Sequence, residues 1–334
     1  MSDRGNLWSI VLAAGEGERM RGLTEKWLGY HRPKQYCTFV GTRSMLQHTL
    51  DRAERLTSRE RIVTVIARSH RRMALEQVGD HAGGLMLQPF NHDTAAGIFL
   101  ALTRVRKRDP KAVVVVLPSD HFVSPEAHFL DSVRNAVGAA TTHPDKLVLL
   151  GVAPDTLELD YGWVAPGRSL GTIHGRPVEI ARSFLEKPGR AQAMAARDTG
   201  ALWNTMVMAV EAETLWQLGW RYLPEIMPSF ESLLEAVDTP NELEVMDSVY
   251  RGMVRRNFSS RLLERARGRV ALMTLENALW SDWGRPERII HTLERIGKMP
   301  AWKAGEGVAR TMGAAPSPPS PIGADLSLGA LNPA

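Results

Sequence analysis

A turn of small residues follows the first apolar run of the sequence, and two cations lie close behind it. The turn reads AAGEGER from Ala13 to Arg19, and Lys34 follows in the segment RPKQY. A glycine-rich turn between a strand and a helix lets backbone N–H groups approach a phosphate closely. Two glycines in such a turn often serve backbone geometry alone. The addition of Arg19 and Lys34 is what favours a phosphate-binding site here.

Further charged residues lie near the ends of other apolar runs. Asp120 ends the segment VVVVLPSD, and Asp282 comes shortly after RVALMTLENALW. Taken singly, each fits a turn or capping acid, which is the commoner role for an aspartate after a strand. Lys187 lies in FLEKP, where an ion pair with Glu186 is the simpler interpretation and Pro188 favours an extended backbone at the lysine. The residues alone leave the choice between structure and chemistry open.

Strand-length apolar runs alternate with helical patterns in the first half of the chain. The runs cover residues 8–14, 61–67, 84–89, 112–120 and 146–153. Between them, residues 44–56 place apolar residues on one helical face behind Ser44, a favourable capping residue. This alternation predicts a doubly wound α/β fold, with a mostly parallel mixed sheet and helices on both faces. Such sheets bind ligands beyond the carboxyl ends of their strands, where AAGEGER and PSDH fall.

The second half of the chain mixes strands with helices. Strands are expected at 161–167, 177–188, 202–210 and 269–276, and helices at 189–198 and 285–297. Residues 212–267 are chiefly helical in pattern, with prolines that break them into short pieces. Beyond Met299 the sequence is rich in Ala, Gly, Pro and Ser and loses its periodicity. We therefore expect one folded domain over residues 1–300 and a disordered tail over residues 301–334.

The composition is that of an ordinary globular protein. The chain has 334 residues, a formal net charge of +4 and one cysteine, Cys37, so an internal disulfide is excluded. It shows no leader pattern and no apolar run near the roughly 20 residues that a membrane helix needs. We therefore expect a cytoplasmic protein that does not span a membrane. We also expect no nucleic-acid binding, because the basic residues are spread along helices and are not interleaved with aromatic residues.

These segments and several others occur in the order found in one family. AAGEGER with RPKQY resembles the amino-terminal signature of the sugar-phosphate nucleotidyltransferases, and the Pro-Lys-Gln form is typical of mannose-1-phosphate guanylyltransferases. The further matches, which extend the resemblance over residues 8 to 297, are LQPFNHDTAAG, VLPSDH, YGWV, SFLEKP, WNTMV and WSDWG. The chain departs from the family pattern at Ala14, at residues 91–93, at Met206 and at Ser259. The resemblance implies a Rossmann-like nucleotide-diphospho-sugar transferase fold and makes residues 1–300 the nucleotidyltransferase catalytic domain.

The resemblance also implies a role for each charged residue. Arg19 would contact the leaving β- and γ-phosphates, Lys34 the α-phosphate, and Lys187 the attacking sugar phosphate. Asp120 and Asp282 would hold a Mg²⁺ ion, which prefers one or two carboxylates together with phosphate oxygens and water. The nucleotide-binding residues implied in the same way are Ala13, Ala14, Gly15, Gly17, Thr94 and Asp120. The implied sugar-phosphate-binding residues are Gly162, Glu186, Lys187 and Asn204.

The implied reaction joins GTP and mannose 1-phosphate to give GDP-mannose and pyrophosphate. The sugar phosphate attacks the α-phosphorus, so positioning and charge stabilisation supply the catalysis and no covalent enzyme intermediate is needed. Two alternatives stay open: the same reaction with another nucleoside triphosphate or hexose 1-phosphate, and a regulatory relative that binds a nucleotide sugar without turnover. All five charged residues of the implied site are present, which favours an enzyme. A homo-oligomer is compatible with the sequence.

Two residue types near these motifs are expected to serve packing rather than chemistry. Trp203, Trp280 and Trp283 are interpreted as packing residues and not as stacking platforms for a base. Cys37 lies beside the Pro-Lys-Gln segment, and we expect it to be a small buried residue. The implied chemistry needs no nucleophilic side chain, so neither interpretation weakens it.

Overall fold

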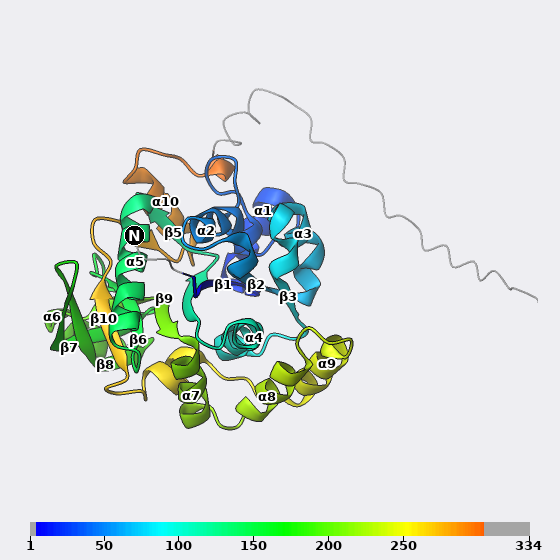
Figure 1. Cartoon of the computed structure of the whole chain (residues 1–334). Coiled ribbons are helices and arrows are strands. Elements are labelled where there is room, and N and C mark those ends of the chain that lie inside the picture. Colours follow the sequence, from blue (N-terminus) through cyan, green and yellow to red (C-terminus); the bar gives the residue numbers. More distant parts are fainter. Residues whose placement is uncertain (1–4, 304–334) are drawn as a thin grey trace, which may run out of the picture.

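One mixed sheet forms the centre of the molecule (Figure 1). The computed structural model describes residues 5–303, without the side chains of residues 80, 82 and 83, and its nine-stranded sheet has the order β3-β2-β1-β4-β9-β6-β10-β8-β7. The strands are β1 (Leu7–Ala13), β2 (Ile62–Ala67), β3 (Leu85–Gln88), β4 (Val113–Pro118), β6 (Leu147–Val152), β7 (Gly162–Ile173), β8 (Arg176–Glu186), β9 (Leu202–Glu211) and β10 (Val270–Thr274). A second, two-stranded sheet pairs β5 (Phe122–Ser124) with β11 (Leu279–Ser281) in antiparallel fashion.

The two halves of the sheet differ in strand direction. Strands β3, β2, β1 and β4 run parallel to one another, as the alternation of apolar runs and helices predicts. Strand β9 then lies antiparallel between β4 and β6, while β7 and β8 form an antiparallel hairpin at the far edge. Because β1 and β4 are parallel neighbours, their carboxyl ends meet at one edge of the sheet. That edge carries both the AAGEGER turn and Asp120.

Helices cover both faces of the sheet, which confirms the predicted layers (Figure 1). Helices α2, α3 and α5 pack on one face, and α4 packs on the other, with α7 and α8 lying against α4. The helices are α1 (Arg21–Leu28), α2 (Met45–Glu54), α3 (Arg71–Val78), α4 (Asp93–Arg108), α5 (Glu126–Thr142), α6 (Arg190–Asp198), α7 (Ala212–Tyr222), α8 (Met227–Ala236), α9 (Glu242–Gly252) and α10 (Pro286–Glu294). Short 3₁₀ turns at Glu18–Met20 and Lys34–Tyr36 and a π-helical turn at Ser259–Leu263 complete the parts that border the site.

Helix α2 begins where the sequence predicts. The backbone N–H of Gln47 donates to the hydroxyl oxygen of Ser44 (3.2 Å), and the Gln47 side chain accepts from the backbone N–H of Ser44 (3.0 Å). This reciprocal pair is a capping box, which satisfies two backbone donors at the start of the helix. The predicted cap at Ser44 is therefore confirmed.

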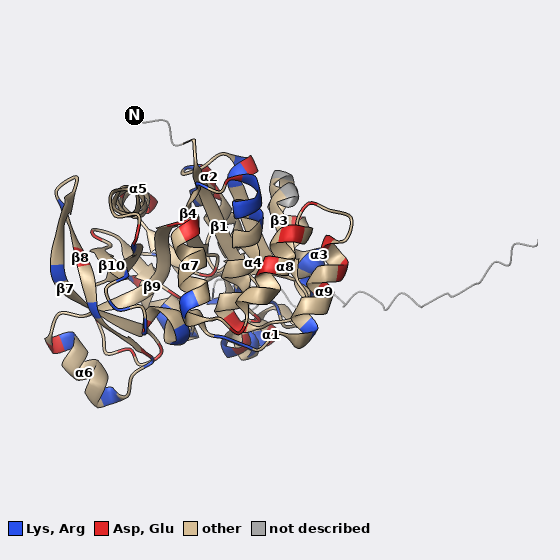
Figure 2. Cartoon of the chain, turned by 60° about the horizontal axis from the view of Figure 1, so that its bottom comes forward, with Lys and Arg blue, Asp and Glu red and all other residues tan. Residues whose placement is uncertain are grey.

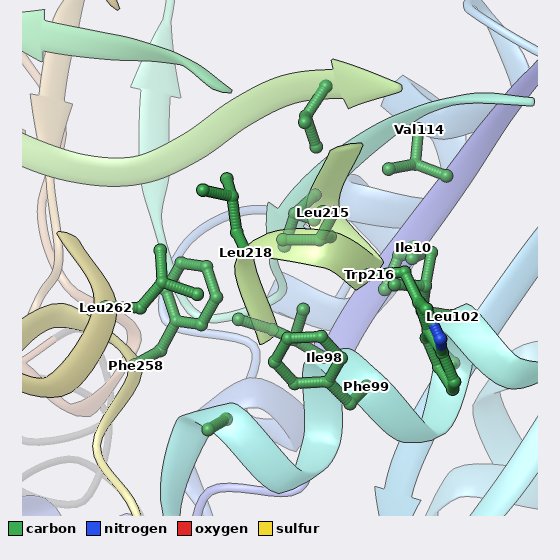
Figure 3. Close-up of a cluster of buried hydrophobic side chains, with 14 of the residues drawn as sticks. Ile10, Ile98, Phe99, Leu102, Val114, Leu215, Trp216, Leu218, Phe258 and Leu262 are labelled. Carbon is green, nitrogen blue, oxygen red and sulfur yellow. The ribbon is translucent and has the colours of Figure 1, made fainter. Parts of the chain in front are cut away.

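Alternate residues of each central strand supply the two hydrophobic layers. On β1, Trp8 and Ile10 belong to the layer that contains α4, whereas Leu7 and Val11 belong to the layer that contains α2. Figure 3 shows part of the α4 layer, in which side chains of the sheet, α4, α7 and the 258–262 segment meet: Ile10, Val114, Ile98, Phe99, Leu102, Leu215, Trp216, Leu218, Phe258 and Leu262. Helix α4 thus packs between the sheet and helices α7 and α8. This packing fixes its amino-terminal end beside the carboxyl end of β1.

Charged residues are spread over the surface in the way the sequence suggested. Figure 2 shows Lys and Arg on many elements, interspersed with Asp and Glu, rather than gathered into a single field. Within residues 5–303, no helix combines the length and apolar character needed to cross a membrane. The strongest local meeting of charges lies in the site described below.

The packed part of the chain continues past residue 300. The ring of Trp302 lies 5.9 Å from that of Trp27 and 5.8 Å from that of Phe39, measured between ring centroids. The backbone N–H of Ala301 also donates to the carbonyl oxygen of Phe39 (2.8 Å). The boundary suggested at residue 300 therefore comes before a residue that packs on the domain. Residues 304–334, the rest of the expected tail, lie outside the described residues.

Replacing Trp302 with alanine is expected to lower the free energy of unfolding by about 1 to 3 kcal/mol, because a half-buried indole loses contact with two aromatic rings. Thermal unfolding measures the change. A chain ended after Pro300 should melt at a similarly reduced temperature, and a chain ended after Lys303 is the control because it keeps these contacts. Wild-type melting of both the Trp302→Ala variant and the Pro300 truncation would contradict the packing role.

Candidate active site

The AAGEGER turn is held in place by the segment that contains Lys34. The side-chain amide of Gln35 donates to the carbonyl oxygens of Ala13 (2.9 Å) and Gly15 (2.8 Å). The hydroxyl of Tyr36 donates to the same Ala13 carbonyl (3.2 Å). These contacts fix the turn relative to Lys34, although the sequence prediction assigned Gln35 no role within its motif.

The two glycines of the turn have different reasons to be glycine. Gly17 has a φ of +68°, and a Cβ at this position would lie 3.0 Å from backbone atoms of Pro33 and Lys34. At Gly15, by contrast, apart from Gly15 itself and its two chain neighbours, no residue of the described chain has a heavy atom within 4 Å of the place a Cβ would take. Gly17 therefore serves backbone geometry, whereas Gly15 leaves open space at the edge of a cavity.

That cavity lies at the carboxyl ends of β1 and β4, where the fold predicts a ligand. It has a volume of about 440 Å³, and the predicted residues that line it are Ala13, Ala14, Gly15, Thr94 and Asp120. A second cavity, of about 720 Å³, shares Asn91, Asp120 and Arg255 with the first and is also lined by Gly17, Arg19 and Lys34. Every residue predicted to bind the nucleotide therefore faces one of two adjoining cavities.

Lys34 joins two loops that are distant in the sequence. Its side chain is buried, and its Nζ lies 2.9 Å from Oδ2 of Asp120 and donates to the backbone carbonyl of Asp282. Asp120 follows β4 and Asp282 follows β11, so the fold places both aspartates around one ammonium group. An ammonium group has three N–H donors. One donor of Lys34 therefore remains for a substrate oxygen.

Both aspartates are held in their ionised form by the groups around them. Burial raises the pKa of Asp120, but the charge and hydrogen bond of Lys34, with a further contribution from His121, together outweigh burial and keep the pKa below its usual value. Burial acts in the same direction on Asp282, where Lys34, Arg288 and the backbone N–H of Gly284 hold the pKa well below its usual range. Both carboxylates are therefore negative at neutral pH, and that of Asp120 lines both cavities.

Both carboxylate oxygens of Asp282 accept hydrogen bonds from other residues of the protein. Its Oδ1 accepts hydrogen bonds from the Tyr161 hydroxyl (2.9 Å), the Gly284 N–H (2.8 Å) and Arg288 (2.8 Å). Its Oδ2 accepts from Arg19 at 3.3 Å. Tyr161 directly precedes β7, Arg288 lies on α10 and Arg19 ends the AAGEGER turn, so Asp282 connects these three parts of the chain.

The two carboxylates fit a magnesium ion. Mg²⁺ prefers one or two carboxylates and completes its shell with water and phosphate oxygens. The side chain of Asp120 is 37% exposed and that of Asp282 is 12% exposed, so Asp120 is the more accessible ligand. Within residues 5–303, no cluster of three or more His, Cys, Asp or Glu is arranged to hold a metal. The described residues thus offer a Mg²⁺ ion two carboxylates, and water and phosphate oxygens of a bound nucleotide would have to complete its shell.

Arg19 is paired with acids at the rim of the larger cavity. Its guanidinium lies 3.3 Å from Asp282 and 3.8 Å from Asp160, and its side chain is 53% exposed. Arg288 also lies within 3.2 Å of Asp160. Exposed ion pairs of this kind contribute little to stability. Arg19 can therefore exchange these carboxylates for phosphate oxygens at small cost.

Three of the four residues predicted to bind the sugar phosphate lie on neighbouring strands, and Lys187 directly follows the last residue of β8. Gly162 of β7 pairs with Glu186 of β8, and a Cβ at Gly162 would lie 3.0 Å from the Glu186 carboxylate and 3.3 Å from the Cβ of Asn204 on β9. Lys187 is exposed, and its Nζ lies 4.0 Å from the Glu186 carboxylate. The structure brings these four residues together, and close packing requires glycine at position 162.

The backbone at Lys187 corrects the expectation of an extended residue before proline. Its φ is +47°, in the left-handed region that residues with side chains seldom adopt. Met206, which replaces a glycine of the family pattern, has a φ of +58° and lines the smaller cavity. The backbone therefore keeps a glycine-like conformation at Met206 and adds a side chain to the wall. Unfavourable dihedral angles of this kind concentrate at binding sites.

Replacing Glu186 with glutamine is expected to stabilise the protein at neutral pH. Burial raises the pKa of Glu186, Lys187 opposes it, and the carboxylates of Glu264 and Asp93 add to it. The folded protein thus binds this proton more tightly than the unfolded chain, so ionised Glu186 costs stability once the pH exceeds about 4.3. We expect Glu186→Gln to gain from a few tenths to about 1 kcal/mol at pH 7 and nothing near pH 4. Urea unfolding at both pH values measures this, and a gain independent of pH would contradict the burial of an ionised carboxylate.

Sequence reasoning missed four residues that organise the site: Gln35, His121, Tyr161 and Arg288. His121 and Tyr161 are direct neighbours of the motif residues Asp120 and Gly162, so their position in those motifs was the available signal. Burial lowers the pKa of His121 to about 4, so the imidazole beside Asp120 is neutral at pH 7. Arg288 lies on α10, where the sequence shows only helical periodicity.

The residues expected to serve packing are buried. Trp203, Trp280 and Trp283 are 4%, 8% and 2% exposed, which confirms that they do not form an open stacking surface. Cys37 is 1% exposed, and burial raises the pKa of its thiol to about 12. A thiol with such a pKa is a poor nucleophile, in agreement with a mechanism that needs none.

Comparison with known proteins establishes the family. Residues 8–298 match the nucleotidyl transferase family, so the chain belongs to that family. A mannose-1-phosphate guanylyltransferase of Klebsiella pneumoniae is 27% identical over 240 residues, which are 71% of this chain and 49% of that protein. Another, from Salmonella typhimurium, is 27% identical over 286 residues, covering 83% of this chain and 58% of that protein. The chain thus spans about half the length of the relatives it matches.

Solved structures agree with this assignment. A Thermus thermophilus protein described as mannose-1-phosphate geranyltransferase superposes with a TM-score of 0.74 and 26% identity, over 87% of this chain and 79% of that chain. A Helicobacter pylori protein described as mannose-6-phosphate isomerase gives a TM-score of 0.65 at 18% identity, over 83% and 99% of the two chains, and supports the fold alone. The predicted fold class, a mostly parallel mixed sheet enclosed by helices, is confirmed.

Proposed function

We propose that this protein transfers a nucleotidyl group from GTP to mannose 1-phosphate, forming GDP-mannose and releasing pyrophosphate. The observation that carries the proposal is buried Lys34, which contacts the Asp120 carboxylate and the Asp282 backbone carbonyl beside two adjoining cavities that Asp120 lines. The names of the matched relatives favour mannose 1-phosphate and a guanylyl group among the possible substrates.

The nucleotide would occupy the two cavities together. Its base and ribose fit the smaller cavity, where the space beside Gly15 lets the chain approach the phosphates and Thr94 lies at the start of α4. The free N–H of Lys34 would contact the α-phosphate, and Arg19 would release its carboxylate partners to hold the β- and γ-phosphates. Cations at these points stabilise the charge that develops on the leaving pyrophosphate.

The sugar phosphate would approach from the β7–β8–β9 side of the site. Lys187 is exposed and would hold the attacking phosphate. The Glu186 carboxylate would accept hydrogen bonds from sugar hydroxyls, and the Asn204 amide would donate hydrogen bonds to them. A phosphate oxygen forms a bond to the α-phosphorus as the bond from that phosphorus to pyrophosphate breaks. The protein contributes by holding two anions in line, which is mainly a matter of positioning and charge.

Asp120 and Asp282 would hold Mg²⁺ in this proposal. When bound with the nucleotide, the ion would neutralise phosphate charge and polarise the α-phosphate. Lys34 keeps both carboxylate loops in place, and the low pKa of each aspartate keeps the ligands ionised at neutral pH.

The proposal is tested by measuring pyrophosphate release with four nucleoside triphosphates against mannose, glucose, galactose and N-acetylglucosamine 1-phosphates. We expect the highest kcat/KM for GTP with mannose 1-phosphate and no release without a sugar phosphate. A higher value for another pair would keep the chemistry and change the substrates. Absence of release in every combination, with a nucleotide sugar still bound, would contradict the proposal and favour a regulatory protein.

A further inference from the structure

The segment between α9 and the π-helical turn lies along the amino-terminal end of α4. The backbone N–H of Arg256 donates to the carbonyl of His92 (3.3 Å), and the backbone N–H of Ala95 donates to the carbonyl of Arg256 (3.2 Å). The N–H of Phe258 donates to the hydroxyl of Thr94 (2.9 Å). These bonds fix the segment against the loop that borders the smaller cavity, so the residues within it have defined positions.

Two successive arginines of this segment have different surroundings. The side chain of Arg256 pairs with Glu225, which lies between α7 and α8. Arg255 lines both the 440 Å³ cavity and the 720 Å³ cavity. The two cavities share Asn91, Asp120 and Arg255, so Arg255 borders the place where they join. No recognised motif of the sequence contains Arg255.

Arg255 also differs from the other cations of the cavities, because its side chain has no partner in the part of the chain that the structure describes. Arg19 pairs with Asp160 and Asp282, and Lys34 pairs with Asp120. Among residues 5–303, Arg255 has no side-chain hydrogen bond or ion pair. Its guanidinium is therefore free to bind a ligand without giving up an existing contact.

The acids that line the cavities with Arg255 are already engaged elsewhere. Their partners are, pair by pair, Glu16 with His70 (3.2 Å), Glu18 with Arg21 (2.7 Å), Asp93 with Asn257 (3.1 Å) and Asp120 with Lys34 (2.9 Å). The Arg255 guanidinium therefore has no acid of the cavity walls to pair with, and a negatively charged ligand would complement it. Arginine offers a planar set of N–H donors that matches two phosphate oxygens at once.

We propose that Arg255 binds the phosphate chain of the nucleoside triphosphate where the two cavities join. This inference rests on the proposed function, because it takes the nucleotide to occupy both cavities. It adds a cation from the carboxyl-terminal half of the chain to the two supplied by the amino-terminal motifs. Arg255 then ties nucleotide binding to the segment that anchors α4.

The test is calorimetric titration of the full chain with the nucleoside triphosphate that gives the highest turnover and with the matching nucleoside. For Arg255→Gln we expect the Kd of the triphosphate to rise about tenfold to hundredfold, as for the loss of a charge-assisted hydrogen bond, with the Kd of the nucleoside unchanged. Arg255→Lys should show a smaller rise, because it keeps the charge and loses the paired donors. Arg251→Gln is the matched control: Arg251 is exposed at the end of α9 and bonds only a carbonyl of its own helix.

The outcomes separate this inference from the proposed function. Wild-type turnover with a triphosphate Kd for Arg255→Gln within about twofold of the wild-type value would overturn the role of Arg255 and leave the proposed function in place. Equal weakening of triphosphate and nucleoside binding would also overturn it, because a phosphate contact is absent from the nucleoside. A wild-type protein that binds none of the four triphosphates would overturn both.

Discussion

Replacing Asp120 with asparagine is expected to lower kcat/KM by a factor on the order of 10³, because the variant loses a magnesium-binding carboxylate beside the α-phosphate site. Asparagine has nearly the same shape as aspartate, and the side chain is 37% exposed, so the fold should be preserved. Steady-state kinetics at saturating Mg²⁺ measures the loss, and far-ultraviolet circular dichroism checks the fold.

The matched control for this variant is Asp131→Asn. Asp131 lies on α5, is exposed, and pairs only with Arg134 of its own helix, so its loss removes the same charge away from the cavities. We expect wild-type kinetics for the control. An Asp120→Asn enzyme that works within threefold of the wild-type rate would remove Asp120 from the proposed metal site.

Replacing Lys34 with methionine is expected to reduce both activity and stability. The side chain is buried between the Asp120 carboxylate and the Asp282 carbonyl, so its removal leaves an acid without its cation. Breaking a fully buried ion pair costs about 3 to 5 kcal/mol, but the Asp120 side chain is 37% exposed and water screens the charge left behind, so we expect a loss of about 1 to 3 kcal/mol. The contact to the α-phosphate is lost as well, and we expect kcat/KM to fall by a factor on the order of 10³. Urea unfolding and steady-state kinetics measure the two losses.

A double variant separates the structural role of Lys34 from its chemical role. Adding Asp120→Asn to Lys34→Met removes the uncompensated charge, so we expect part of the lost stability to return while activity stays low. Stability losses that simply add would show that Lys34 and Asp120 do not interact. Recovery of activity in the double variant would contradict the role of both residues in the reaction.

The fold could be predicted where local pattern decides it. Continuous apolar runs specify β1, β2 and β4 as buried strands, and the helices between them specify their parallel order. In the second half, the pattern predicts the strands but not their partners. The antiparallel position of β9 between β4 and β6 depends on contacts between distant segments, which local periodicity does not record.

The site shows the same division. The common edge of parallel strands predicts that the AAGEGER turn and Asp120 lie close together. The approach of Asp282 followed from family resemblance, since β11 belongs to a separate small sheet. Contacts that depend on tertiary packing could not be predicted, namely the burial of Lys34 and the bond from Tyr161 to Asp282. The left-handed backbone at Lys187 likewise overrides the usual preference of a residue before proline.

In the proposed reaction, an oxygen of the sugar phosphate attacks the α-phosphorus of the nucleotide. Mannose 1-phosphate that carries ¹⁸O at its non-bridging phosphate oxygens, incubated with GTP and Mg²⁺, tests this step. Mass spectrometry should find all of the label in GDP-mannose and none in pyrophosphate, with the product formed on the order of 10³ times more slowly by Asp120→Asn. Label in pyrophosphate, or a protein that binds GDP-mannose but forms none, would contradict the account.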